Sequence, residues 1–251
     1  MKKTTVLMVT IMLALCAPVF AETTGLVSLD LDYPARTVEE KARDVNRKPV
    51  ETLTFFGLQP DMRVIELFPG GGWYTKLLGP YLEEKGQLYL AIGTDRVADK
   101  LSEFGLNKVK VTGDVQGFTK TDLPGFVFEV DSIDLVERDV DMVLTFRNAH
   151  NFTEEARDKL NRAVFDALKP GGIYGVIDHT RRHMEPMHPD RWRRVDPVLI
   201  IAEAVDAGFE FVGYSTIHSR PEDSLQYDTR HISLPNESDR FTLKFRKPVS
   251  Q

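Results

Sequence analysis

The sequence predicts an α/β protein with a doubly wound, mostly parallel seven-stranded sheet, an antiparallel strand at its C-terminal edge and a helical extension before it. Two observations on the sequence and one general rule of sheet topology predict this class. Apolar runs of strand length alternate along the chain with runs of helical periodicity. Strands joined by helical crossovers form parallel sheets that helices cover on both faces. A glycine turn, Gly70-Gly71-Gly72, follows the first predicted strand, and such a turn builds a ligand site at a strand's carboxyl end.

The first residues have the pattern of a secretory signal peptide. Residues 1–3 are positively charged, residues 6–16 form an apolar core, and residues 19–21 fit a small-residue cleavage site. The alternative is a membrane anchor, but the apolar run is shorter than the ~20 residues that a spanning helix needs. We expect cleavage after Ala21, no stable membrane span afterwards, and a periplasmic or otherwise exported location in a bacterium.

Cysteine content and charge narrow the partners. The only cysteine, Cys16, lies inside the predicted signal peptide, and Leu15 precedes it where a lipidation site would need a small residue. A mature chain without thiols excludes disulfides, zinc–thiolate sites and cysteine nucleophiles. The formal net charge of −6 becomes more acidic without Lys2 and Lys3, which argues against nucleic acid as a partner. Small ligands are the expected partners.

The elements are expected in the following order. Residues 22–58 form an N-terminal extension, in which the capping box of Thr37 and Glu40 predicts a charged helix running towards Phe56. In the main domain, residues 59–248, strands are expected at 63–68, 87–92, 108–111, 141–146, 173–178, 209–217 and 240–245. Helices are expected at 73–82, 96–104, 153–168 and 197–207. The last two strands would pair as an antiparallel edge, and residues 119–140 show no clear pattern.

The glycine turn could bind a ligand, or it could simply connect a strand to a helix. Glycines leave no Cβ to hold off a ligand and permit positive φ, while the N–H groups of the next helix can receive polar ligand atoms. The plain alternative is a flexible turn between a strand and a helix. A Walker loop would need lysine and Ser or Thr where Trp73 and Tyr74 stand, and a dinucleotide fingerprint would need glycine at Thr75. Nucleoside triphosphates and NAD are therefore disfavoured as ligands.

Four motifs in order carry a family resemblance. Glu66 precedes the glycines, Gly113-Asp114 follows the third strand, residues 141–152 read DMVLTFRNAHNF, and residues 168–172 read LKPGG. Together they resemble class I S-adenosylmethionine-dependent methyltransferases, and more narrowly a group of exported bacterial proteins described as predicted methyltransferases. The resemblance covers roughly residues 37–248.

The resemblance implies a Rossmann-like fold, S-adenosylmethionine as cofactor and a set of cofactor contacts. Glu66 and the backbone of Gly70, Gly71 and Gly72 would face the methionine part, and Asp114 would lie on the adenine side. Two positions depart from the family pattern. Phe68 replaces the first glycine of the loop, and Ile92-Gly93 replace the acidic residue that usually holds the ribose hydroxyls. Asp95 lies close enough to substitute for that carboxylate.

Candidate catalytic residues follow the fourth and fifth strands. Methyl transfer from a sulfonium is an in-line displacement, so the protein mainly positions the reactants and can add a base. His150 is the candidate base or acceptor-orienting group, with a backbone-bonded loop histidine as the alternative. Asn148 and Asn151 flank it as candidate substrate contacts, and His179 is a third. Asp178 and His179 are not expected to act as a pair, because neighbouring strand residues point to opposite faces.

Residues 181–194 form a basic loop with one tryptophan. It could recognise an anionic acceptor or a lipid headgroup, or be a solvated lid. His179, His183 and His188 are spaced too irregularly to predict a metal site.

The sequence as a whole predicts a methyltransferase that uses S-adenosylmethionine on an unidentified small molecule or envelope component. The alternative is an inactive methyltransferase fold that binds a nucleoside-like or other metabolite. Fold resemblance alone does not decide between them.

Overall fold

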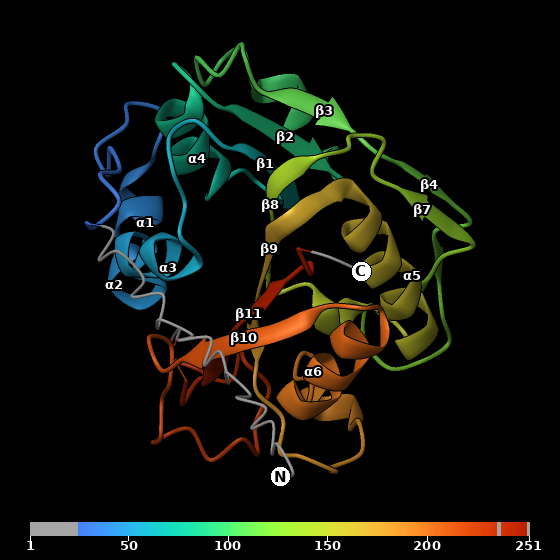
Figure 1. Cartoon of the computed structure of the whole chain (residues 1–251). Helices are drawn as coiled ribbons and strands as arrows, with labels where there is room; N and C mark the ends of the chain where they lie inside the picture. The colour runs from blue at the N-terminus through green and yellow to red at the C-terminus, as the bar shows by residue number, and fades with distance from the viewer. Residues whose placement is uncertain (1–24, 235–236, 250–251) are drawn as a thin grey trace, which may run out of the picture.

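The computed structural model describes residues 25–234 and 237–249, so the predicted signal peptide lies outside the described residues. A seven-stranded sheet has the order β10-β11-β9-β8-β1-β2-β3 (Figure 1). The last five strands in this order are β9 (Leu168–His179), β8 (Val140–Phe146), β1 (Arg63–Leu67), β2 (Gln87–Ala91) and β3 (Lys110–Thr112). They are parallel to one another. The predicted mostly parallel sheet is confirmed.

The C-terminal edge of the sheet contains the antiparallel pair. β11 (Arg240–Arg246) runs antiparallel to both β9 and β10 (Glu210–Ser215). The predicted antiparallel pairing is therefore present, with β10 outermost and β11 inserted beside β9. Burial explains this order, because Phe241, Leu243 and Phe245 of β11 are buried whereas the side chains of β10 are largely exposed.

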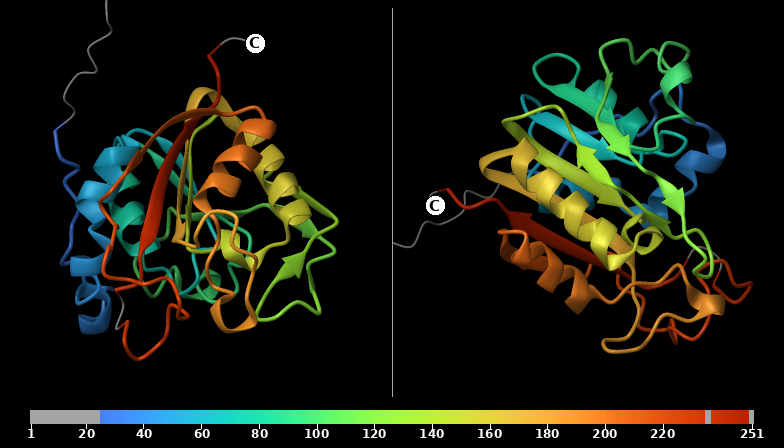
Figure 2. Two further views of the ribbon diagram at one scale, coloured as in Figure 1. Left: turned by 90° about the horizontal axis from the view of Figure 1, so that it is seen from below. Right: turned by 90° about the vertical axis from the view of Figure 1, so that its right-hand side faces the viewer.

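Helices cover both faces of the sheet, as a doubly wound fold requires (Figure 2). α3 (Pro49–Phe56) and α4 (Thr75–Leu82) pack with Val64, Leu88 and Leu144 on one face. α5 (Glu154–Ala167) and α6 (Pro197–Asp206) pack with Ile65 and Val143 on the other. Neighbouring residues of β1 thus enter opposite cores, which is why the strand is apolar throughout.

The N-terminal extension differs from the expected single helix. It forms α1 (Val38–Lys41), α2 (Asp44–Arg47) and α3. The capping box of Thr37 and Glu40 is present, but the chain turns at Lys48, whose φ is 40°. Proline disfavours helical geometry in the residue before it and is favoured at the first helical position, so Pro49 ends one helix and begins the next.

Two further segments were not described correctly by the sequence pattern. The helix expected at 96–104 is wrong, since only a 3₁₀ turn, η1 (Ala98–Lys100), forms between hydrogen-bonded turns. Val97 and Leu101 anchor this segment in the core without a continuous helical ladder. Residues 114–134 form two small antiparallel sheets, which pair β4 (Asp114–Gln116) with β7 (Ser132–Asp134) and β5 (Thr119–Lys120) with β6 (Phe128–Glu129).

Two 3₁₀ turns complete the described chain, η2 (Ala149–Asn151) and η3 (Pro189–Arg191). Across residues 25–234 and 237–249, no helix has the length and apolar character needed to cross a membrane.

Gly175 on β9 gives a test of how the extension docks on the sheet. A Cβ added there would lie 2.7 Å from Leu144 Cδ2 and 2.9 Å from Phe56 Cε1. Gly175→Ala should therefore lower the free energy of unfolding by about 1–3 kcal/mol, the usual cost of overpacking a core. Gly213→Ala is the matched control, because a Cβ at Gly213 meets nothing within 4 Å. Urea unfolding of both variants measures the difference, and equal losses would contradict this packing.

Candidate active site

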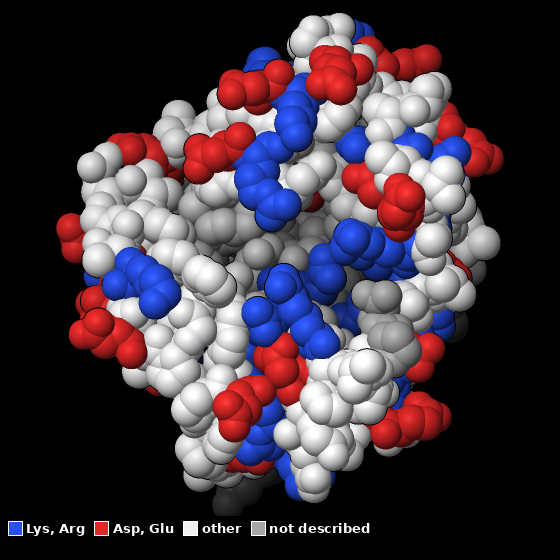
Figure 3. All heavy atoms as spheres, turned by 180° about the vertical axis from the view of Figure 1, so that it is seen from behind, with Lys and Arg blue, Asp and Glu red and all other residues white. Residues whose placement is uncertain are grey.

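A cavity of about 780 Å³ opens at the carboxyl ends of β1, β8 and β9, a size typical of small-molecule sites. Residues from the extension, the glycine turn, the loop after β8 and the segment before β11 all line it. On the face drawn in Figure 3, Lys and Arg side chains gather around a hollow in the surface. The cavity is the place where most of the predicted site residues meet.

The glycine turn contributes two of its three glycines to the cavity wall. Gly70 and Gly71 line the cavity, and a Cβ on either would meet nothing within 4 Å. Gly72 does not line it. Its φ is +85°, and an added Cβ would lie 2.9 Å from Val97 Cγ2. Gly72 is therefore required by backbone conformation and packing, and it lies outside the cavity wall.

Phe68 occupies a position with left-handed backbone geometry. Its φ is 51°, and its N–H donates to Ala91 O at 3.0 Å. The ring packs against Phe152, with 5.0 Å between centroids, and lines the cavity. Ile92 and Arg147, which follow β2 and β8, have φ values of 62° and 64°. Non-glycine residues in this region are strained, and such strain is concentrated at functional sites.

Glu66 lies at the base of the cavity beside the glycine turn. Its side chain is buried and accepts a hydrogen bond from Thr75 Oγ1 at 2.7 Å. Burial raises the pKa of Glu66 to about 7, against the smaller lowering effects of Thr75 and Arg47. Glu66 therefore changes charge near neutral pH at the position where the resemblance places a cofactor contact.

The carboxylates expected on the ribose and adenine sides lie outside the cavity wall. Asp114 is exposed at the start of β4, where Oδ1 accepts a hydrogen bond from Gln116 Nε2 at 2.7 Å. Asp95 is exposed as well, and its neighbour Arg96 lines the cavity. Neither aspartate is brought together with Glu66 and the glycines.

His150 is held by a carboxylate from the neighbouring strand. Its Nδ1 lies 2.7 Å from Asp178 Oδ1, and its backbone N–H donates to Asp178 Oδ2 at 3.0 Å. An ionised carboxylate only accepts hydrogen bonds, so Nδ1 carries the proton and Nε2 is left to accept one. The His150 side chain lines the cavity. This arrangement orients a histidine as a general base.

The other predicted substrate contacts also reach the cavity. His179 Nδ1 lies 2.9 Å from the Ser238 hydroxyl, and burial, followed by the charges of His150 and nearby arginines, holds the pKa of His179 well below its usual value. Asn148 Nδ2 donates to Phe146 O at 2.9 Å. Asn148, Asn151 and His179 all line the cavity. The structure thus brings all three to the same wall as His150.

The sequence pattern did not pair Asp178 with His150. Asp178 and His179 were correctly separated as neighbours on a strand, but the partner of Asp178 comes from the loop after β8. Phe146 of β8 is paired with Ile177 of β9 in the sheet register. Asp178, the next residue of β9, therefore lies close to the loop that leaves β8, and this signal can be read only once the two strands are known to be adjacent.

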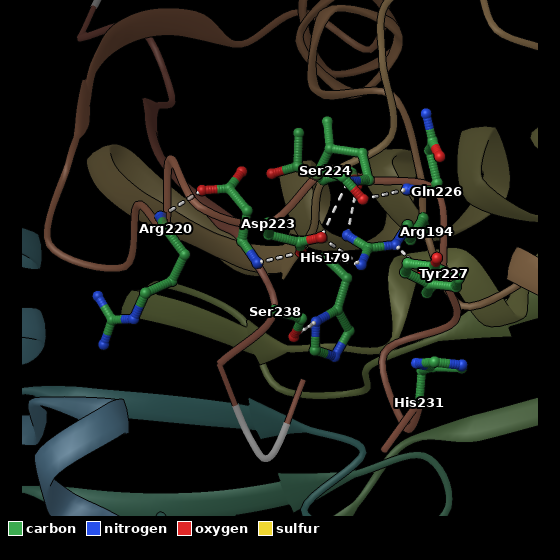
Figure 4. A network of polar contacts seen from close by, with 12 residues as sticks. His179, Arg194, Arg220, Asp223, Ser224, Gln226, Tyr227, His231 and Ser238 are labelled. Carbon is green, nitrogen blue, oxygen red and sulfur yellow. Dashed lines mark hydrogen bonds and ion pairs between the residues drawn. The ribbon is translucent and has the colours of Figure 1, made fainter. Parts of the chain in front are cut away.

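The basic loop has a buried part, a part that lines the cavity and an exposed part. Arg194 is buried and pairs with Asp223 at 2.8 Å, while its Nε donates to Tyr227 O (Figure 4). This ion pair ties the basic loop to the segment before β11, so Arg194 is not part of a solvated lid. Arg193 and Trp192 line the cavity, and the Trp192 ring is 5.8 Å from that of His150.

The sequence pattern also missed most of the arginines of the cavity. They come from six separate parts of the chain. The full set is Arg43, Arg47, Arg96, Arg147, Arg193, Arg230 and Arg240. The carboxylates of the wall are Glu39, Glu40 and Glu66. An acidic protein therefore has a cationic cavity.

His179, His183 and His188 each have a separate hydrogen-bond partner. His183 Nδ1 lies 2.9 Å from Asp196, and His188 Nδ1 accepts from the Asp190 N–H. Within the part of the chain that the structure describes, no group of three His, Cys, Asp or Glu side chains could hold a metal ion.

The chain is similar in fold to proteins of known structure. No protein-family model and no curated protein matches the chain. A SAM-dependent methyltransferase from Aquifex aeolicus matches with a TM-score of 0.56 and 18% identity, over 82% of this chain and 92% of that one. The fold is that of S-adenosylmethionine-dependent methyltransferases.

Two further matches show the range of proteins with this fold. The (4+2)-cyclase SpnF matches with a TM-score of 0.51 and 17% identity, over 82% of this chain and 81% of that one. Human N-acetylserotonin methyltransferase in complex with SAM matches with a TM-score of 0.51 and 14% identity, over 84% of this chain and 54% of that one. At these identities the matches establish the fold and leave the reaction open.

The raised pKa of Glu66 predicts a specific pH dependence of stability. An unfolded glutamate ionises near its ordinary pKa of 4.5, whereas folded Glu66 keeps its proton up to about pH 7. The native state binds more protons in this window, so stability falls as pH rises from 4.5 to 7. Glu66→Gln should remove this fall, which the pKa difference sets at up to about 3 kcal/mol.

Urea unfolding at pH 4.5 and pH 8 measures the effect. Glu103→Gln serves as the control because Glu103 is exposed and lies outside the cavity. Parallel pH profiles for wild type and Glu66→Gln would show that Glu66 does not titrate in this window.

Proposed function

We propose that this protein is an exported methyltransferase that transfers a methyl group from S-adenosylmethionine to a small molecule or envelope component. The observation that carries the proposal is the single cavity that joins the open glycine turn and Glu66 to the His150–Asp178 pair. A donor and an acceptor held there would lie in one enclosure, which is the main requirement of an in-line displacement.

The residues around the glycine turn fit the methionine part of the cofactor. Gly70 and Gly71 leave space above their backbone, and Glu66 turns a buried carboxylate towards it. Glu66 would hold the amino group, since a carboxylate and an ammonium form a charge-assisted hydrogen bond. The ribose side fits less closely, because Arg96 and not a carboxylate lines the wall after β2. Bound S-adenosylmethionine would supply an electrophilic methyl group.

The His150–Asp178 pair would manage the proton of the acceptor. Asp178 holds the imidazole through Nδ1 and fixes its tautomer, so His150 Nε2 takes the proton that the acceptor atom loses. The imidazolium that forms is stabilised by the adjacent carboxylate, as in other histidine–aspartate pairs. His179 stays neutral beside it and can donate or accept a hydrogen bond through Nε2. Asn148 and Asn151 offer amide groups for orienting the acceptor.

A second candidate function is a binding protein without transfer activity. The specific observation that favours it is the charge of the cavity wall, where seven arginines face three glutamates. S-adenosylmethionine carries a net positive charge, and a wall of this kind suits an anionic ligand better. The fold does not decide between the two functions, since it also occurs in a protein described as a cyclase.

Calorimetric titration of the purified protein separates these two functions. S-adenosylmethionine and S-adenosylhomocysteine should bind saturably, and NAD should not. Gly71→Val should weaken both by roughly tenfold or more, because the new side chain projects into the open space above the turn. Gly213→Val is the matched control, since Gly213 also has open space but lies on β10. If neither S-adenosylmethionine nor S-adenosylhomocysteine binds to wild type, the binding-protein function is favoured. If a folded Gly71→Val variant binds both compounds as tightly as wild type, the proposed site is refuted.

The role of Asp178 predicts a tautomer that nitrogen-15 NMR can measure. In wild type, His150 should be protonated at Nδ1 and bare at Nε2, and Asp178→Asn should disturb this state. With an identified acceptor, the variant should keep cofactor binding and lose turnover by ~10²–10⁴-fold, the usual contribution of a general base. His188→Gln is the control, because this exposed histidine lies outside the cavity. Unchanged turnover in Asp178→Asn would remove the pair from the mechanism.

A further inference from the structure

Three arginines from distant parts of the chain line the same cavity. Arg47 ends α2, Arg147 follows β8 and Arg240 begins β11. Arg47 and Arg240 are 7% and 6% exposed. All three are among the residues that line this one cavity. The fold therefore brings three cations together at one wall.

Burial and the positive charge of Arg147 lower the pKa of Arg47 and of Arg240. Burial, followed by the charge of Arg147, lowers the pKa of Arg47 to about 9 and that of Arg240 to about 10. Burial also lowers the pKa of Arg147. At these pKa values Arg47 and Arg240 stay protonated at neutral pH, so the wall keeps positive charge. Placing like charges close together in a poorly solvated site is unfavourable unless an anion joins them.

The contrast with other buried arginines is informative. Arg157 pairs with Glu203 at 2.6 Å and Arg194 with Asp223 at 2.8 Å. Among the described residues, Arg47 and Arg147 form no ion pair with a carboxylate. Arg47 instead lies over the Trp73 ring, with 4.3 Å from Cζ to the centroid. The chain thus supplies structural partners for arginines elsewhere and leaves two cations facing the cavity.

We propose that Arg47, Arg147 and Arg240 bind a carboxylate or phosphate group of the methyl acceptor. This inference rests on the proposed function and names its substrate class, an anionic small molecule. The planar guanidinium forks match both oxyanions through paired hydrogen bonds. Arg147 lies three residues before His150, so an anion bound there leaves the rest of the acceptor beside the base.

The cofactor also has a carboxylate, which is a second possible source of the anion. The order of the strands distinguishes the cofactor's carboxylate from an anionic group of the acceptor. Arg240 begins β11, which lies three strands from β1 and its glycine turn, or about 14 Å at the usual strand spacing. Arg147 follows β8, between them. Two of the three arginines are thus displaced towards His179 and away from the glycine turn, on the acceptor side.

Binding of inorganic phosphate tests the site without an identified acceptor. Calorimetry at constant ionic strength should show saturable phosphate binding to wild type, weakened about tenfold or more by Arg147→Gln and by Arg47→Gln, as expected for lost charge-assisted hydrogen bonds. Arg162→Gln is the matched control, because this exposed arginine pairs only with Asp158 on α5. Thermal unfolding identifies folded variants, and Arg47→Gln carries the test if Arg147→Gln does not fold. Equal phosphate affinity in wild type and both variants would overturn the site.

Repeating the titration with saturating S-adenosylhomocysteine identifies the source of the anion. Phosphate binding that persists beside this compound supports the acceptor site. Competition between them assigns the arginines to the cofactor's carboxylate and overturns the inference. If S-adenosylhomocysteine does not bind while phosphate binding still depends on Arg147, the proposed function fails and the anion site itself stands.

Discussion

The buried carboxylate of Asp178 is the constraint on which the site depends. It accepts hydrogen bonds from the backbone N–H of His150, from His150 Nδ1 and from the N–H of His179. A fully buried carboxylate without such donors would be costly, so the loop after β8 must lie against the end of β9. That placement orients the imidazole, and Arg147, three residues earlier, leaves the strand with a φ of 64°. The orientation of the candidate base therefore follows from this contact.

The N-terminal extension is as much a part of the cavity as the sheet. Trp73, just after the glycines, donates through Nε1 to Glu40 O at 2.8 Å, and Lys76 pairs with the Glu40 side chain. Phe56 of α3 belongs to the core and fills the space left by Gly175. The extension is thus fixed at two separate places, above the glycine turn and within the core. Arg47 lies between these two contacts in the chain, so both contacts fix its position at the cavity.

The sequence predicted what local pattern encodes and missed what depends on spatial neighbours. Alternating apolar runs predicted the parallel strands, and the position after the fourth of them pointed to His150, which lines the cavity. Pro49 marked a helix boundary that the charged pattern around it concealed. Arg47, Arg147 and Arg240 are about a hundred residues apart, so no motif could have joined them. Phe68 reads as a departure from a glycine loop, yet its backbone keeps the left-handed conformation that glycine would adopt, because packing against Phe152 compensates for the strain.

Charge balance connects the two ends of the cavity. The arginines of the cavity wall would repel a cationic cofactor and weaken its binding. An anion bound at the arginines would reduce this repulsion. Binding free energies are linked, so the anion and the cofactor would each strengthen the binding of the other by the same factor. Glu66 adds to this coupling, because its pKa of about 7 leaves it partly protonated at neutral pH. A bound ammonium would favour the ionised form, and the newly charged Glu66 would then offset one of the arginines. On this argument an anionic partner in the same cavity strengthens the binding of the methyl donor to the cationic wall.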